Sequence, residues 1–72
     1  MKKIKKIKIK INGKIKPINQ DSILSTVLKN LKIPLNKVAI ELNRQIIDKK
    51  KISKIILKKN DKIEIVHFIG GG

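Results

Sequence analysis

Near its beginning the chain alternates isoleucine with lysine and then reaches an Asn-Gly pair, in the stretch KIKIKINGKIKPI. A period of two is typical of a β-strand with one buried face. Ile4, Ile7 and Ile11 would also suit a basic amphipathic helix on a membrane. The Asn-Gly pair argues against that helix, because it is a strong hairpin signal. The sequence therefore predicts that the fold begins with a β-hairpin.

The length of the hairpin loop follows if the isoleucines are required to share one face. A two-residue loop would pair Lys10 with Ile15 and mix the two faces of the sheet. A three-residue loop with Gly13 in a left-handed bulge would instead pair Ile9 with Ile15. We therefore expect the three-residue loop. Pro17 cannot donate to a strand ladder, which predicts an edge strand that ends at this residue.

A single helix is expected next. Asp21 or Ser22 offers an N-cap, and Pro34 stops a helix of about ten residues. The helix carries one apolar stripe, made by Ile23, Leu24, Val27, Leu28 and Leu31.

Alternating or short apolar runs predict the remaining elements. Residues 38–42 read as a strand, 46–47 as a very short strand, 50–57 as a helical turn and 62–68 as a final strand. An Asn-Asp pair marks a turn before the final strand. Together these elements predict an α+β fold, with a mixed four- to five-stranded sheet covered by one helix.

The charge of the chain first suggests an anionic partner. Nineteen Lys and Arg against five Asp and Glu give a net charge of +14, which is typical of proteins that bind nucleic acid or anionic membranes. However, Arg44 is the only arginine and Trp and Tyr are absent, so the composition argues against nucleic-acid binding. An AT-rich genome would also enrich Lys, Ile and Asn. Because we find neither a secretory signal nor a membrane-spanning stretch, we expect no membrane partner and a cytoplasmic (or plastid stroma) location.

Catalytic side chains are scarce in this sequence. His67 is the only histidine, cysteine is absent, and the five carboxylates show no metal-ligand spacing. No residues combine the nucleophile, base and orienting group that covalent catalysis needs. We therefore expect that the chain is not an enzyme and binds no metal or cofactor itself.

The carboxyl-terminal stretch HFIGGG ends in three consecutive glycines. Gly70, Gly71 and Gly72 have no Cβ atoms, so they can form a thin, extended leader that enters the active site of another protein. A terminal carboxylate is a reactive handle once another protein activates it. We expect a folded domain over residues 1–69 and a flexible C-terminal glycine tail over residues 70–72.

The stretch VAIELNRQIIDKKKISKIILKKNDKIEIVHFIGGG resembles the second half of the ThiS family, the sulfur carriers of thiamine biosynthesis. KIKINGKIKPI and the helix after it are similar to the first half. The resemblance implies a β-grasp, ubiquitin-like fold. It implies that a ThiF-type adenylating enzyme uses ATP to adenylate the carboxylate of Gly72. Sulfur from a persulfide protein then yields a thiocarboxylate, which donates sulfur to a ThiG-type thiazole synthase.

A docking surface for these partners is expected beside the glycines. It comprises outward-facing residues of two predicted strands and the residue that follows: Ala39, Glu41, Val66, Phe68 and Ile69. Carriers of the ThiS family are usually less basic than this chain. Three alternatives stay open: the small subunit of molybdopterin synthase, a carrier for transfer-RNA thiolation, and, in a different class, a basic nucleic-acid-binding module.

Overall fold

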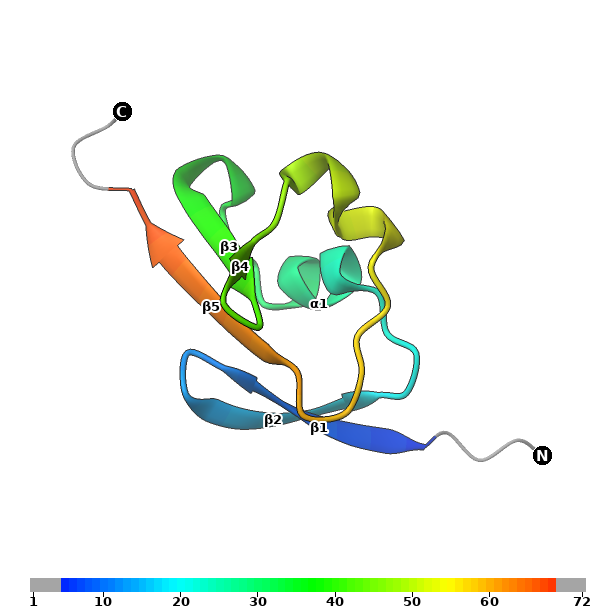
Figure 1. Cartoon of the computed structure of the whole chain (residues 1–72). Helices are drawn as coiled ribbons and strands as arrows, with labels where there is room; N and C mark the ends of the chain where they lie inside the picture. Colours follow the sequence, from blue (N-terminus) through cyan, green and yellow to red (C-terminus); the bar gives the residue numbers. More distant parts are fainter. Residues whose placement is uncertain (1–4, 69–72) are drawn as a thin grey trace.

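The computed structural model describes residues 5–68, which form five strands, one α-helix and two 3-10 helices (Figure 1). The elements in chain order are β1 (Lys6–Ile11), β2 (Lys14–Asn19), α1 (Leu24–Asn30), η1 (Leu35–Lys37), β3 (Val38–Leu42), β4 (Gln45–Ile46), η2 (Lys49–Lys54) and β5 (Lys62–His67). This confirms the predicted sheet with one α-helix. The short strand expected at 46–47 lies one residue earlier, and the helical turn expected over 50–57 is η2, which begins one residue earlier and ends at Lys54.

The strands form one mixed sheet in the order β2-β1-β5-β3-β4. The last strand, β5, lies at the centre, parallel to β1 and antiparallel to β3 (Figure 1). The predicted edge position of the strand that contains Pro17 is confirmed, because β2 is outermost. Its predicted end at Pro17 is wrong, since β2 continues to Asn19. An edge strand has one side without a partner, so it tolerates a residue that lacks an N–H.

The hairpin between β1 and β2 has a shorter loop than the sequence predicts. Ile11 pairs with Lys14 and Lys10 pairs with Ile15, so only two residues form the loop. The expected three-residue loop with a glycine bulge is therefore wrong. As a consequence Ile15 shares the outer face of the sheet with Lys10, and 63% of its surface is exposed.

The conformation and contacts of Asn12 explain this outcome. Asn12 and Gly13 have φ values of 50° and 82°, the left-handed pair that suits the twist of a two-residue hairpin. The Asn12 N–H donates to the Ile63 carbonyl at 2.9 Å, and Asn12 Oδ1 accepts from the Ile65 N–H at 2.8 Å. The loop is thus held against β5 by two hydrogen bonds, each of which contributes about 0.5–1.5 kcal/mol net.

The hydrophobic core lies between the sheet and the layer formed by α1 and η2 (Figure 1). The buried apolar side chains come from every layer: Ile9, Ile11, Leu24, Val27, Leu28, Val38, Ile40, Ile52, Leu57, Ile63 and Ile65. The predicted inward faces of the strands at 38–42 and 62–68 are confirmed. Burial of these aliphatic side chains is the main stabilising contribution, at about 1.5–3 kcal/mol for each that is fully buried.

The start of the helix differs from the prediction. The α1 helix has seven residues, and Ile23 is its N-cap without a side-chain hydrogen bond. Ser22 Oγ instead donates to the Asn19 carbonyl at 2.6 Å. The Leu24 N–H donates to the Ile55 carbonyl at 2.8 Å, so a distant backbone group satisfies a donor that a cap would otherwise serve. The predicted cap at Asp21 or Ser22 is therefore wrong.

Candidate functional site

The outer face of the sheet, opposite α1, carries the residues expected to contact partners. In the β3–β5 pair, Ala39 lies opposite Val66 and Ile40 lies opposite Ile65. Because successive side chains of a strand point to opposite faces and Ile40 and Ile65 are buried, Ala39 and Val66 lie together on the outer face. Val66 is 48% exposed, whereas Ala39 is half-buried.

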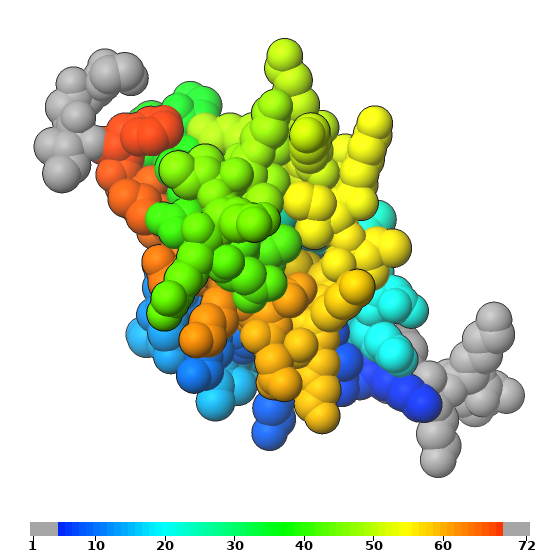
Figure 2. Space-filling view, in the orientation of Figure 1, coloured from blue at the N-terminus to red at the C-terminus, as the bar shows by residue number. Residues whose placement is uncertain are grey.

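Phe68 extends this apolar surface just beyond the end of β5. Its N–H donates to the Lys37 carbonyl at 2.9 Å, and its side chain is 52% exposed. We call Ala39, Val66 and Phe68 the outer apolar patch. The space-filling view shows the end of β5, in orange to red, against β3, in green (Figure 2). Exposed valine and phenylalanine side chains at the end of one strand are typical of a protein–protein contact.

Lys49 is a member of this site that the sequence analysis missed. Its Nζ lies 5.3 Å from the centre of the Phe68 ring, within the range of a cation–π interaction. Lys49 belongs to η2, and no sequence pattern connects it with Phe68, because the fold alone brings the two residues together. The contact places a positive charge over the exposed ring of the outer apolar patch.

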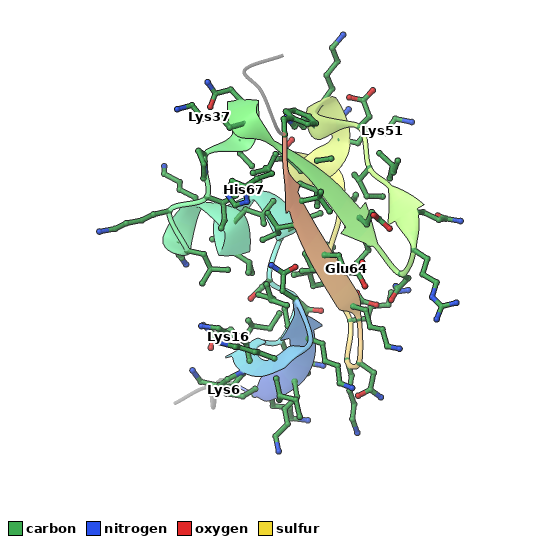
Figure 3. The ribbon with its side chains drawn as sticks, turned by 90° about the vertical axis from the view of Figure 1, so that its left-hand side faces the viewer. Lys6, Lys16, Lys37, Lys51, Glu64 and His67 are labelled. Carbon is green, nitrogen blue, oxygen red and sulfur yellow. The ribbon has the colours of Figure 1, made fainter. Side chains whose placement is uncertain are left out.

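Two carboxylates lie directly opposite each other next to the patch. Glu41, which the sequence analysis includes, pairs with Glu64, which it does not. The outward Glu64 is labelled on β5 in Figure 3. Like charges directly opposite in antiparallel strands are destabilising. This pair should therefore lower the stability of the β3–β5 pairing, although the chain has only five acidic residues.

The remaining predicted site residues lie outside the described part of the chain. These are Ile69, Gly70, Gly71 and Gly72, and the roles expected for them stay predictions. His67 lies inside the described part, where it is exposed and pairs with Val38 on β3. It stands next to Phe68 at the end of β5, as its place in the sequence indicates.

The described residues form neither a group of metal ligands nor a membrane-spanning helix. Within residues 5–68, no three or more His, Asp or Glu side chains are grouped so that they could hold a metal ion. None of the helices in that part of the chain has both the length and the apolar character needed to cross a membrane. The notable features of the site are therefore its surface, its charges and its position at the end of β5.

Comparison with known protein sequences points to one family. The sequence model of the ThiS family matches residues 9–72. A thiazole synthase from Magnetococcus marinus is 35% identical over 66 residues, which are 92% of this chain and 20% of that protein. A thiazole synthase from Paramagnetospirillum magneticum matches to the same extent. The chain thus spans about a fifth of the length of these two relatives.

A third relative is matched over nearly its whole length. The sulfur carrier protein ThiS of Bacillus subtilis is 34% identical over 65 residues, which are 89% of this chain and 98% of that protein. Among solved structures, the thiamine biosynthesis protein ThiS from Geobacter metallireducens superposes with a TM-score of 0.76 at 24% identity. The superposition covers 92% of this chain and 100% of that chain, and it confirms the expected β-grasp fold.

Proposed function

The chain belongs to the ThiS family, and from this premise we propose that it is a sulfur carrier for thiamine biosynthesis. The observation that carries the proposal is the family match over residues 9–72, which includes both the folded body and the three glycines. The relative matched over 98% of its length is named a sulfur carrier protein. This name supports the carrier role that we propose.

In this proposal the carboxylate of Gly72 is the group that is modified. An oxygen of this carboxylate attacks the α-phosphorus of ATP, and pyrophosphate leaves. The product is an acyl adenylate, in which AMP is a far better leaving group than hydroxide. A ThiF-type adenylating enzyme binds the ATP, so the carrier needs no cofactor of its own. Gly70 and Gly71 form the thin leader that reaches the active site.

Sulfur then replaces AMP at the activated carbonyl. The terminal sulfur of a persulfide on a donor protein attacks the carbonyl carbon, and AMP leaves. A thiol then reduces the remaining S–S bond and supplies two electrons, which leaves a thiocarboxylate on Gly72. The thiocarboxylate gives its sulfur to a ThiG-type thiazole synthase. Two relatives of this chain that carry the name thiazole synthase support this choice of acceptor.

We propose that partners recognise the carrier through the outer apolar patch. Val66 and Phe68 are about half exposed and lie at the end of the strand that leads toward the glycines. Ala39 completes the patch, Glu41 lies beside it and Ile69 is proposed to extend it. Burial of an exposed aromatic ring commonly supplies a large share of the binding energy at such an interface.

The names of the relatives favour thiazole formation over the other two sulfur pathways. The molybdopterin and transfer-RNA alternatives share the carrier chemistry, so only the sulfur acceptor distinguishes them. The nucleic-acid alternative predicts a different behaviour. Binding of phosphates by many lysines falls steeply as the salt concentration rises, whereas formation of a thiocarboxylate requires ATP and a sulfur source.

Intact mass spectrometry tests the proposal. The full chain is incubated with the ThiF-type enzyme of its own organism, ATP and a persulfide donor. We expect one oxygen to be replaced by sulfur, and fragmentation should place the sulfur on Gly72. Omission of ATP is the control. If the complete mixture leaves the mass unchanged, or if sulfur is found at another residue, the proposed function is wrong.

A further inference from the structure

A second feature of the outer face lies at the end of the sheet away from the outer apolar patch. A depression of about 270 Å³ is present where β2, β1 and the start of β5 meet. Its lining consists of Lys8, Ile9, Lys10, Ile15, Asn60 and Lys62. Lys6, on the same strand as Lys8 and Lys10, lies at the end of the molecule away from His67 (Figure 3). We call Lys8, Lys10, Lys62 and Ile15 the lysine-rimmed depression.

The register of the strands creates this arrangement. Because Ile9 and Ile11 point into the core, Lys8 and Lys10 point to the outer face. Lys62 is the parallel partner of Lys10. Ile15 joins them only because the two-residue loop pairs it with Lys10. Three cationic side chains thus surround an apolar side chain that is 63% exposed.

The three charged side chains that line the depression are all lysines, and one carboxylate lies close by on the same face, since Glu64 lines the adjoining depression with Lys10 and Lys62. Lys10 and Lys62 are direct neighbours, and like charges in that position repel each other. The nearest carboxylate in the adjoining turn, Asp61, accepts hydrogen bonds from Asn43 Nδ2 at 3.1 Å and from the Lys58 N–H at 2.8 Å. Asp61 is therefore engaged within the fold. A carboxylate supplied by a partner would relieve the repulsion and gain charge-assisted hydrogen bonds.

We propose that the lysine-rimmed depression docks an acidic segment of the thiazole synthase, whose carboxylates contact the lysines while an apolar side chain covers Ile15. This inference rests on the proposed function, since it names a second contact with the same partner. Lys62 and Val66 lie on one strand and one face, about 13 Å apart at 3.3 Å per residue. One protein surface can therefore cover both the depression and the outer apolar patch.

The chemistry of the depression favours a protein over a nucleic acid. Its cations are all lysines, and it holds no aromatic side chain on which a base could stack. An exposed isoleucine at its centre gains from contact with an apolar side chain, which a phosphate backbone does not provide. An acidic segment with an apolar residue matches both properties, and its attraction to the lysines would also speed association.

A matched pair of triple variants tests the proposal. The first variant changes Lys8, Lys10 and Lys62 to glutamine. The second changes three exposed lysines on the helical side of the fold to glutamine: Lys29, Lys32 and Lys54. Each variant loses three positive charges, which takes the net charge from +14 to +11. Binding of the full chain to the thiazole synthase of its own organism is measured by calorimetry at low and at physiological salt.

We expect the first variant to bind about tenfold more weakly at low salt and the control to bind within about twofold of the original chain. The loss should shrink as salt rises. Ile15→Thr keeps a β-branched residue in the strand and should weaken binding several-fold in both buffers. Melting curves verify that each variant is folded. Equal losses in the two triple variants, or unchanged binding in the first, would overturn the proposal.

Two further measurements separate this inference from its premise. The first triple variant should still gain a thiocarboxylate with the ThiF-type enzyme, so its failure to bind thiazole synthase cannot be ascribed to lost carrier chemistry. If the original chain gains no sulfur at all, the proposed function fails first.

A twenty-nucleotide thymidine strand and phosphatidylglycerol vesicles are the competing probes. Should either bind more tightly than the thiazole synthase and depend on the same three lysines, the depression is a polyanion site and the proposal is wrong.

Discussion

The side-chain nitrogen of Lys49 lies 5.3 Å from the centre of the Phe68 ring. Lys49 belongs to η2 on the covered side of the sheet, and Phe68 follows the central strand β5. The contact therefore connects the end of the sheet to the layer that covers it. Phe68 also donates its N–H to the Lys37 carbonyl, so its backbone is bonded to the residue that precedes β3 while its ring contacts Lys49.

Replacement of Lys49 tests the energy of this contact. Lys49→Ala should lower the free energy of unfolding by about 0.5–1 kcal/mol, the usual contribution of an exposed cation–π pair. Lys49→Arg should keep the original stability, because guanidinium groups interact equally well with aromatic rings. Urea denaturation measures both variants, with Lys50→Ala as the neighbouring control. Equal effects of alanine at positions 49 and 50 would show that the ring contact contributes nothing.

Phe68→Ala should weaken binding to the adenylating enzyme or to the thiazole synthase by more than about 1 kcal/mol, because the exposed ring is the largest side chain of the outer apolar patch. Ile56→Ala is the control, since Ile56 is 53% exposed, close to the 52% of Phe68, but lies outside the patch. Calorimetric titration measures both. Identical affinities for the two variants would remove Phe68 from the docking surface.

Deletion of Gly72 should abolish thiazole formation and leave thermal unfolding unchanged. Addition of one alanine after Gly72 should have the same two effects. The reason is that the core residues lie between Ile9 and Ile65, and glycine has no side chain to contribute to that core. A reconstituted thiazole assay and a melting curve measure the two properties. Continued thiazole formation by either variant would contradict the proposed role of the terminal carboxylate.

Gly13→Val should destabilise the fold, whereas Gly13→Asn should be tolerated. Gly13 has a φ of +82°, and a Cβ placed there meets no atom within 4 Å. The penalty is therefore one of backbone strain, about 1–2 kcal/mol for most residues and more for a β-branched one. Asparagine accepts this conformation more readily. Chemical denaturation of the two variants checks the difference, and equal midpoints would argue against the left-handed two-residue loop.

Neutralisation of the opposed pair Glu41 and Glu64 should stabilise the sheet. Glu64→Gln and Glu41→Gln should each raise the free energy of unfolding by about 0.2–1 kcal/mol at low salt, and less at high salt because the repulsion is screened. The double variant should be less stable than the sum of the single effects predicts, since either change alone removes the repulsion. Strict additivity would show that the two carboxylates do not interact.

Much of the fold could be predicted from periodicity alone. The alternation in KVAIELN and KIEIVHF predicts which side chains are buried, and Val38, Ile40, Ile63 and Ile65 are indeed in the core. The same alternation predicts that Val66 and Ala39 share the outer face, as they do. Such patterns succeed because a strand with one covered face has no other way to bury its apolar side chains.

The errors arise where a distant part of the chain decides a local structure. The predicted hairpin loop assumed that Ile15 must reach the core, but the bonds from Asn12 to β5 favour the shorter loop. The predicted helix cap assumed a local side chain, but the Ile55 carbonyl takes that role for the Leu24 N–H. The contact of Lys49 with Phe68 has the same origin. None of these partners can be found from the neighbouring sequence.

The central position of β5 has a consequence for how this protein is made. Its neighbours β1 and β3 precede it in the chain and pair with nothing on that side until it arrives. During synthesis, residues 6–42 therefore lack β5, the strand that joins β1 to β3. The sheet can form completely only after residue 67 has been added. Isoleucine-rich strands that lack a partner are prone to aggregate, and charged residues that alternate with the isoleucines, as the lysines of β1 do, oppose such association.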